Sequence, residues 1–205
     1  MKSGEVRAYR MTARAEAAER TGERIIDAML RRYADTPYDR IRLDDVATDA
    51  EVTVQTVIRR FGTKHGLLAA TIEREFARLA ADRAAALADS PEATLHSLVR
   101  YYETYGELIL KLYAEASQAP GVPELAARAR TYHVGWCRQA FADSLADVAD
   151  ARTRERRMAQ VIAICDATTW RVLRFDGHLS KGQTEQALLE LLLPVLGASS
   201  PAPAP

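Results

Sequence analysis

Apolar side chains recur every three or four residues along most of the chain, which is the period of an α-helix with one buried face. No stretch shows the sustained alternation of apolar and polar residues that a half-buried strand requires. The sequence therefore predicts an all-α fold. The predicted helices cover residues 21–35, two short segments within 43–61, and then 64–87, 91–117, 124–145, 153–175 and 184–196.

Residues with helix-capping side chains mark several of the expected helix starts. Thr21, Thr63 and Ser90 each precede an apolar helical pattern, and Pro91 suits the first position of its helix. Proline and glycine cluster at 119–123, so we expect the clearest break of the C-terminal region there.

The segment 43–68 carries the most specific pattern in the chain. Two short apolar patterns on either side of Val52 predict two helices joined by a tight turn. The residues expected to anchor them are Val46, Ala47 and Ala50 in the first helix, and Val57, Ile58 and Phe61 in the second. The other face of the second helix is polar and cationic, as insertion into the major groove of DNA requires, and carries Thr53, Gln55, Thr56, Arg59 and Arg60.

This segment resembles the helix-turn-helix of the TetR family of transcriptional repressors. The agreement in order and spacing covers residues 21–68, and the rest of the chain agrees in length and helical character. The resemblance implies a homodimer that binds a double-stranded DNA operator and is released from it by a small-molecule ligand. The matching residues are Val46-Ala47, Ala50, Val52-Thr53, Thr56-Val57-Ile58, Phe61, Thr63-Lys64 and Leu67-Leu68.

The resemblance also divides the chain. It implies a DNA-binding domain over residues 21–67 and a ligand-binding and dimerisation domain over 68–197. Residues 1–20 are rich in alanine and arginine and are expected to form a frayed helix or a mobile arm. The proline- and alanine-rich residues 198–205 are expected to be a disordered tail.

Some positions depart from the family's pattern. Glu51 stands where the family usually has glycine, so a left-handed backbone there would cost roughly 1–2 kcal/mol. Ile58 replaces a tyrosine that usually touches the DNA backbone, and Arg42 replaces a threonine that usually caps the second helix. These changes leave open which residues contact phosphate, and Arg42, Arg59 and Arg60 are candidates to do so.

The residues expected to contact DNA fall into two groups. Base edges are reached from the N-terminal part of the reading helix, so Gln55 and Thr56 are expected to read bases and Val54 to contact a thymine methyl group. The phosphate backbone is expected to be held by Thr53, Arg59, Arg60 and Lys64, with Arg42 as a further candidate.

Aromatic residues concentrate in the C-terminal region, where they favour a pocket for a mostly apolar ligand. The best candidates to line it are Tyr105, Trp136 and Trp170. Asp166 is the only charged residue between Met158 and Trp170. Three interpretations of this carboxylate remain open: it lies at a subunit rim, it recognises a polar or cationic group of a ligand, or it forms a structural ion pair.

Two C-terminal helices are expected to form the dimer. The helix 153–175 is apolar on more than one side, and the helix 184–196 is crowded with leucine and valine. We expect both to pair with their copies in a four-helix interface, because a monomer would leave too much apolar surface open to water. The crowded residues are Leu188, Leu189, Leu191, Leu192, Leu193, Val195 and Leu196.

The composition of the chain gives no strong sign of DNA binding, and it argues against a secreted or membrane protein. The 28 basic and 28 acidic residues balance, although Thr53–His65 contains three basic residues and no acidic one. No signal peptide or membrane span is visible, which favours a cytoplasmic protein. Cys137 and Cys165 lie far apart in apolar patterns and are interpreted as buried free thiols.

No catalytic motif is present. None of the four histidines follows a glutamate by three residues, and the chain has neither a glycine-rich phosphate loop nor a nucleophile elbow. His133 and Cys137 share a helix face but make only two of the ligands that zinc needs. We expect no enzyme activity, cofactor or metal. The alternative to a DNA-binding regulator is a helical small-molecule sensor that has lost specific DNA binding.

Overall fold

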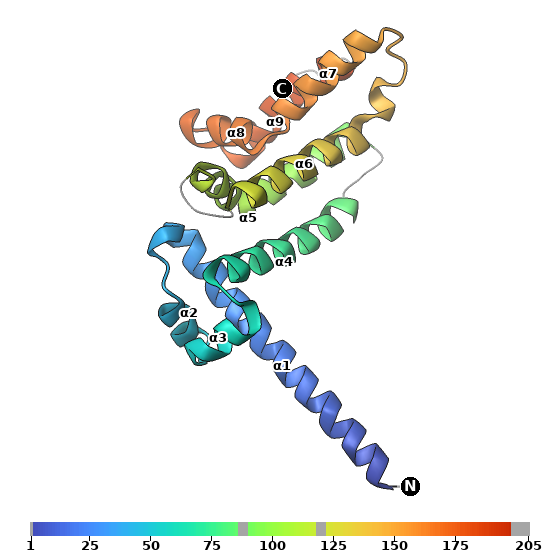
Figure 1. The fold of residues 1–205 in the computed structure, drawn as a ribbon. Helices are drawn as coiled ribbons and strands as arrows, with labels where there is room; N and C mark the ends of the chain where they lie inside the picture. Colours follow the sequence, from blue (N-terminus) through green and yellow to red (C-terminus); the bar gives the residue numbers. More distant parts are fainter. Residues whose placement is uncertain (1, 86–89, 118–121, 198–205) are drawn as a thin grey trace. The chain divides into compact units, whose positions relative to one another are not determined.

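A computed structural model describes residues 2–85, 90–117 and 122–197 of the 205-residue chain. These residues form helices joined by short connections, with no strand among them, so the predicted all-α fold is confirmed (Figure 1). The contacts divide the chain into two units, residues 1–77 with 118–122 and residues 78–117 with 123–205. The predicted tail at 198–205 and most of the predicted break at 119–123 lie outside the described residues.

The first unit is a small helical domain built around one face of a long helix. Three residues on one face of that helix, Ile25, Ala28 and Met29, are fully buried. Val57, Leu67 and Leu68 from the later helices are fully buried as well. Its elements are α1 (Lys2–Asp35), the 3₁₀ turn η1 (Tyr38–Arg40), α2 (Leu43–Asp49), α3 (Val54–Phe61) and the first part of α4 (Lys64–Ala85).

The first helix is much longer than its capping signal predicted. We expected Thr21 to be its N-cap, but α1 begins at Lys2 and Thr21 lies inside it, where its hydroxyl donates to the Ala17 carbonyl at 2.9 Å. The prediction that Thr21 caps the first helix is therefore wrong. The alanines and arginines that precede it are among the strongest helix formers, and a threonine is tolerated inside a helix when it bonds back by one turn.

An arginine network ties α4 to α1. Arg74 pairs with Glu23 at 2.8 Å and Asp27 at 2.7 Å on α1, and with the neighbouring Glu75 at 2.8 Å. Burial acts to lower the pKa of Arg74, but the three carboxylates outweigh it and the pKa is raised. The predicted domain boundary at 67/68 thus falls inside a helix whose first turns belong to the core of the first unit.

The second unit packs its helices around one large hydrophobic core. Leu98, Tyr102, Phe141, Val161 and Leu192 are among its buried residues. The predicted cap at Ser90 is confirmed, since its hydroxyl accepts from the Ala93 N–H at 3.2 Å. The elements are α5 (Pro91–Glu115), α6 (Val122–Phe141), η2 (Asp143–Leu145), α7 (Ala151–Ile164), α8 (Ala167–Arg171), the π-helical turn η3 (Val172–Asp176) and α9 (Lys181–Leu196).

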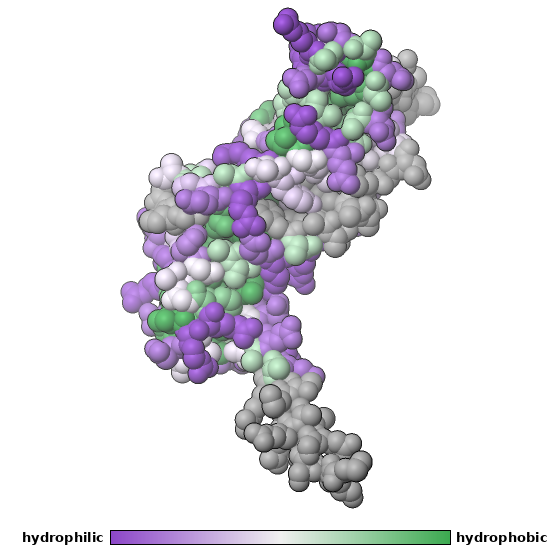
Figure 2. Space-filling view, turned by 45° about the vertical axis from the view of Figure 1, so that its right-hand side comes forward, coloured by the Kyte–Doolittle hydropathy of each residue, from purple (hydrophilic) through white to green (hydrophobic). Residues whose placement is uncertain are grey.

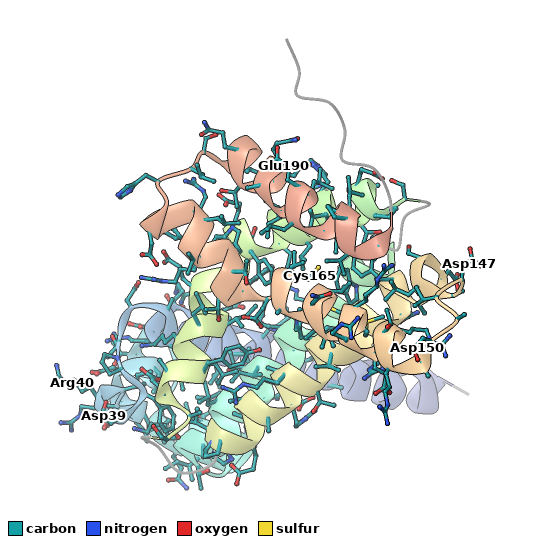
Figure 3. The ribbon with its side chains drawn as sticks, turned by 90° about the horizontal axis from the view of Figure 1, so that it is seen from above. Asp39, Arg40, Asp147, Asp150, Cys165 and Glu190 are labelled. Atoms are coloured by element: carbon teal, nitrogen blue, oxygen red, sulfur yellow. The ribbon has the colours of Figure 1, made fainter. Side chains whose placement is uncertain are left out.

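The prediction of a single helix over 153–175 is wrong, because the helix is interrupted near its middle. Helix α7 ends at Ile164, and the Asp166 carboxylate accepts from the Thr168 N–H at 2.8 Å and so starts α8. The apolar pattern runs through the break without interruption, which hid it at the level of sequence. Cys165, at the junction, lies among the helices of the second unit in Figure 3, whereas Asp147 and Asp150 lie at its edge.

A buried histidine on α6 holds this junction. The His133 Nε2–H donates at 3.1 Å to the Ile162 carbonyl, one of the last carbonyls of α7. The Cys137 sulfur lies 3.7 Å from Nε2, and the Asp166 carboxylate 3.9 Å. Burial of the ring opposes its protonation, but Cys137, the Ile162 carbonyl and Asp166 outweigh burial and raise the pKa of His133.

We expect His133 to make the stability of the second unit depend on pH. A raised pKa in the folded state means that the protonated ring adds most stability below about pH 6.5, the usual value for an unfolded chain, and that this gain is lost as the pH rises through the folded value. His133→Gln keeps a donor for Ile162 but does not titrate. Urea unfolding at several pH values should therefore show the wild type losing its advantage over His133→Gln from pH 5 to pH 8. An equal difference at both ends would contradict this assignment.

Candidate nucleic-acid interface

The candidate reading helix is α3, which is only eight residues long. Val57 is fully buried against the core and Phe61 is half-buried, as the apolar spacing predicted. Ile58 is 40% exposed, so its predicted role as an anchor is wrong. A helix of about two turns has room for a single buried stripe, and Ile58 lies beside that stripe rather than within it.

The outward face of α3 is polar and carries no acidic residue. Gln55 and Arg59 are exposed, and Arg59 makes no hydrogen bond or ion pair with the described part of the chain. Thr53 caps the helix, accepting from the Thr56 N–H at 3.3 Å, and the two hydroxyl oxygens lie 3.0 Å apart. Val54 is half-buried at the same end of the helix. The predicted base-reading positions therefore share the N-terminal end of one accessible helix.

The turn before α3 has a backbone that favours glycine. After α2 ends, Glu51 adopts a φ of 55°, as the departure from the family pattern suggested. The Val52 N–H donates to the Ala47 carbonyl at 2.9 Å and the Glu51 N–H to the Thr48 carbonyl at 3.1 Å, the pair of bonds that closes a helix through a left-handed residue. The Glu51 carboxylate also lies 3.4 Å from the Arg24 guanidinium on α1.

Glu51→Gly should stabilise the protein. The left-handed conformation costs a non-glycine residue about 1–2 kcal/mol, and glycine removes this cost. The greater freedom of glycine in the unfolded chain offsets about 0.4–1 kcal/mol of the stabilisation. The exposed Arg24 pair adds little. We expect a net gain of about 0.5–1 kcal/mol, read from urea unfolding. Glu51→Ala, which removes the carboxylate and keeps the strained backbone, is the control, and it should not share the gain.

Arg60, at the C-terminal end of α3, is engaged with α1. Its Nη1 donates at 2.7 Å to the Ala18 carbonyl, and its guanidinium lies over Gly22, where the Cβ of any other residue would collide with it. Arg60 was predicted to contact phosphate. The structure adds a structural role that the sequence did not indicate: this side chain ties the reading helix to the first helix.

Lys64, also predicted to contact phosphate, makes three bonds within the first unit. Its ammonium donates to the carbonyls of Tyr38 at 2.9 Å, Asp39 at 3.2 Å and Ile41 at 3.0 Å, and it lies 4.5 Å from the centre of the Tyr38 ring. An ammonium has three N–H donors, and three acceptors here match that number. Lys64 thereby holds the 3₁₀ turn η1 against the start of α4.

Lys64→Met should destabilise the fold. The change keeps most of the aliphatic stem and removes the three hydrogen bonds, so we expect a loss of about 1–3 kcal/mol in the free energy of unfolding, measured by circular dichroism in urea. Arg59→Met is the matched control, because Arg59 is an exposed cation with no hydrogen bond or ion pair to the described residues, and the change should alter stability by less than about 0.5 kcal/mol. Coincident unfolding curves for the two variants would show that the three bonds of Lys64 do not stabilise the fold.

The acidic residues of α2 are partly neutralised by α1. Arg32 donates to both oxygens of Asp49, at 2.6 and 2.9 Å, and lies 3.8 Å from Asp45. The hydrogen bond from Arg32 holds the pKa of Asp49 below its usual value.

Arg42, the further phosphate candidate, is exposed at the N-cap of α2 and lies 3.9 Å from Asp44. Arg40 and Asp39 of η1 lie at the outer edge in Figure 3.

The candidate ligand-binding residues of the second unit are mostly committed to its core. Trp170 is buried against Gly106, and its ring N–H donates to Glu103 at 3.1 Å. Trp136 is buried with its ring edge-on to Phe141. Tyr105 is half-buried, while Asp166 caps α8 and so has a structural partner. The structure thus brings the two tryptophans into one core, and their predicted contact with a ligand stays a prediction.

Comparison with solved structures places this fold among known proteins, whereas comparison by sequence does not. No protein-family profile matches the chain, and no curated protein is similar to it in sequence. Solved structures do match. A transcriptional regulator from Rhodococcus sp. Rha1 is 16% identical with a TM-score of 0.67, covering 89% of this chain and 99% of its own. A protein described as a TetR-family transcriptional regulator from Rhodococcus sp. is 20% identical with a TM-score of 0.63, covering 86% and 98%.

A regulator from Pseudomonas aeruginosa PAO1 gives a similar result, with 14% identity, a TM-score of 0.66, and coverage of 86% of this chain and 90% of its own. The chain therefore has the fold of TetR-family transcriptional regulators. Identities this low establish the fold and leave the operator and the ligand to be found. Among the described residues, no helix is long and apolar enough to cross a membrane, and no group of three or more histidine, cysteine, aspartate or glutamate side chains is arranged to hold a metal ion.

Proposed function

We propose that this protein is a sequence-specific DNA-binding transcriptional regulator that inserts α3 into the major groove. The observation that carries the proposal is the outward face of α3, which is accessible, polar and cationic and lacks any carboxylate, in a fold shared with transcriptional regulators. Side chains of this kind at the N-terminal end of a reading helix are the ones that reach base edges.

The roles of the residues follow from their positions. Gln55 reads one base pair, for which an adenine is the best match to its amide, and Thr56 and Val54 contact neighbouring bases. Arg59 and Arg42 bind phosphates, together with the Thr53 hydroxyl at the N-terminus of α3. Arg60 and Lys64 contribute through the helices they hold in place, and any direct phosphate contact by them would compete with these internal bonds.

A homodimer is part of the proposal, with the segment from α7 to η3 and the helix α9 at the interface. The exposed apolar area of α9 is smaller than its crowded sequence predicts, because five of the seven leucine and valine residues are buried in their own subunit. The large hydrophobic side chains still exposed in the described part of the second unit are Val172, Phe175 and Leu191, on η3 and α9. On the face drawn in Figure 2, hydrophobic residues reach the surface as separate patches among hydrophilic ones. A two-fold contact through η3 and α9 would cover these three residues on both copies.

A small-molecule effector would act by population shift. A dimer whose two reading helices lie about 34–36 Å apart matches successive major grooves. A ligand that prefers a dimer with another spacing lowers DNA affinity by its differential binding energy and by no more. The second unit, with Tyr105 and the two tryptophans, is the proposed site of that ligand. The protein is proposed to work in the cytoplasm, where its DNA is.

Gln55→Ala tests the proposal at a single side chain. A gel-shift screen of genomic fragments from around the gene first identifies a bound duplex, and each base pair of that duplex is then varied. The variant should lose about 1–3 kcal/mol of binding at one base-pair position of each half-site and discriminate less there. Unchanged ratios across all variants would show that Gln55 reads no base. No bound fragment at all would favour the alternative of a sensor without specific DNA binding.

A further inference from the structure

One large apolar side chain stands on the surface of the first unit, and it belongs to the candidate reading helix. Among the residues of that unit whose side chains the structure describes, Ile58 is the one large hydrophobic residue that is exposed, at 40%. Single exposed apolar residues are common on protein surfaces, so exposure alone assigns no role to Ile58. The direction in which it points on α3 decides what it can contact.

The contacts of α3 fix that direction. Successive residues of an α-helix are about 100° apart, so Ile58 lies about 160° round the helix from Arg60. The Arg60 guanidinium bonds the Ala18 carbonyl on α1 at 2.7 Å. Val57, about 100° from Ile58, is fully buried. Ile58 therefore points away from α1 and lies beside the buried side of α3.

The neighbours of Ile58 toward the start of α3 are Val54 and Gln55. They precede it by four and three residues, so they lie about 40° and 60° round the helix from it. Val54 is half-buried, and Gln55 is exposed and is the proposed base reader. Val54 and Ile58 thus form an apolar strip, about 6 Å long, that runs along one side of the proposed reading surface.

The chemistry of the major groove limits what an apolar strip can recognise there. Base edges in this groove carry hydrogen-bond donors and acceptors, which an isoleucine cannot pair, and one apolar group, the 5-methyl group of thymine. Phosphates offer an isoleucine no favourable contact either, because they are charged acceptors. A buried contact with a thymine methyl group removes apolar surface from water on both molecules. Thymine is therefore the base whose edge matches Ile58.

We propose that Ile58 is a specificity-determining residue, which selects thymine by covering its 5-methyl group beside the base pair that Gln55 reads. The inference rests on the proposed function and deepens it, because it adds Ile58 to the reading residues and names a base that each half-site contains. Ile58 makes this selection through shape and burial, whereas Gln55 makes its selection through hydrogen bonds.

Removal of single methyl groups from the DNA tests the proposal. Each thymine of the duplex found by the genomic screen is replaced in turn by uracil, which keeps the hydrogen-bonding groups of thymine and lacks the methyl group. For the full-length wild type, uracil at one thymine position should weaken binding about fourfold per half-site, the factor expected for one methyl group taken out of an apolar contact. Uracil outside the half-sites is the control and should leave binding unchanged.

Two variants of Ile58 connect this loss to the side chain. Ile58→Ala removes the apolar contact, so it should bind the thymine and uracil duplexes equally well. Ile58→Val keeps a branched apolar side chain and should still prefer thymine at that position. Ile58 is exposed and alanine favours a helix, so we expect both variants to fold, and circular dichroism with urea unfolding checks this.

A preference for thymine over uracil that is the same in Ile58→Ala as in the wild type would overturn the inference, and so would a wild type that is indifferent to uracil at every thymine of the half-sites. Either result leaves the proposed function standing, because the specific duplex is still bound. Failure of the wild type to distinguish any duplex from random DNA would instead overturn the proposed function itself.

Discussion

A helix of eight residues is not stable alone in water, so the reading surface depends on the packing of α3 against α2 and on its attachment to α1 through Arg60. One fully buried side chain, Val57, fixes the inner side of α3. The ends are held by polar contacts: Thr53 and the bonds around Glu51 at the start, and Arg60 on the Ala18 carbonyl at the end. Everything proposed for DNA binding follows from this attachment, because it decides which residues α3 presents to solvent.

The basic residues of the first unit divide into two kinds. Arg32, Arg60, Arg74 and Lys64 each bind carboxylates or carbonyls within the domain and hold its helices together. Arg59 and Arg42 remain at the surface. Charged groups satisfied inside a fold stabilise it, and phosphate can attract them only by competing with those partners. Counting basic residues near a reading helix therefore overestimates the number that are free to bind DNA.

The sequence predicted what depends on local spacing. The two short helices, the turn at Val52, and the caps at Ser90 and Thr63 follow from patterns within a few residues, and the structure contains them. The exposed positions of Gln55 and Arg59 followed from the same apolar spacing. The break at Asp166 was missed because the apolar pattern continues across it. The bonds of Arg60 and Lys64 join residues 42 and 23–26 positions apart, and no local pattern encodes such pairs.

Selection of duplexes from a random pool by the purified full-length protein tests the central claim most directly. We expect enrichment of one sequence with two related half-sites about 10 base pairs apart or a multiple of that spacing. That duplex should bind at least about a thousandfold more tightly than random DNA of the same length at the same salt concentration. A pool that stays random after repeated rounds, with equal affinity for all duplexes, would contradict the claim that α3 reads DNA sequence.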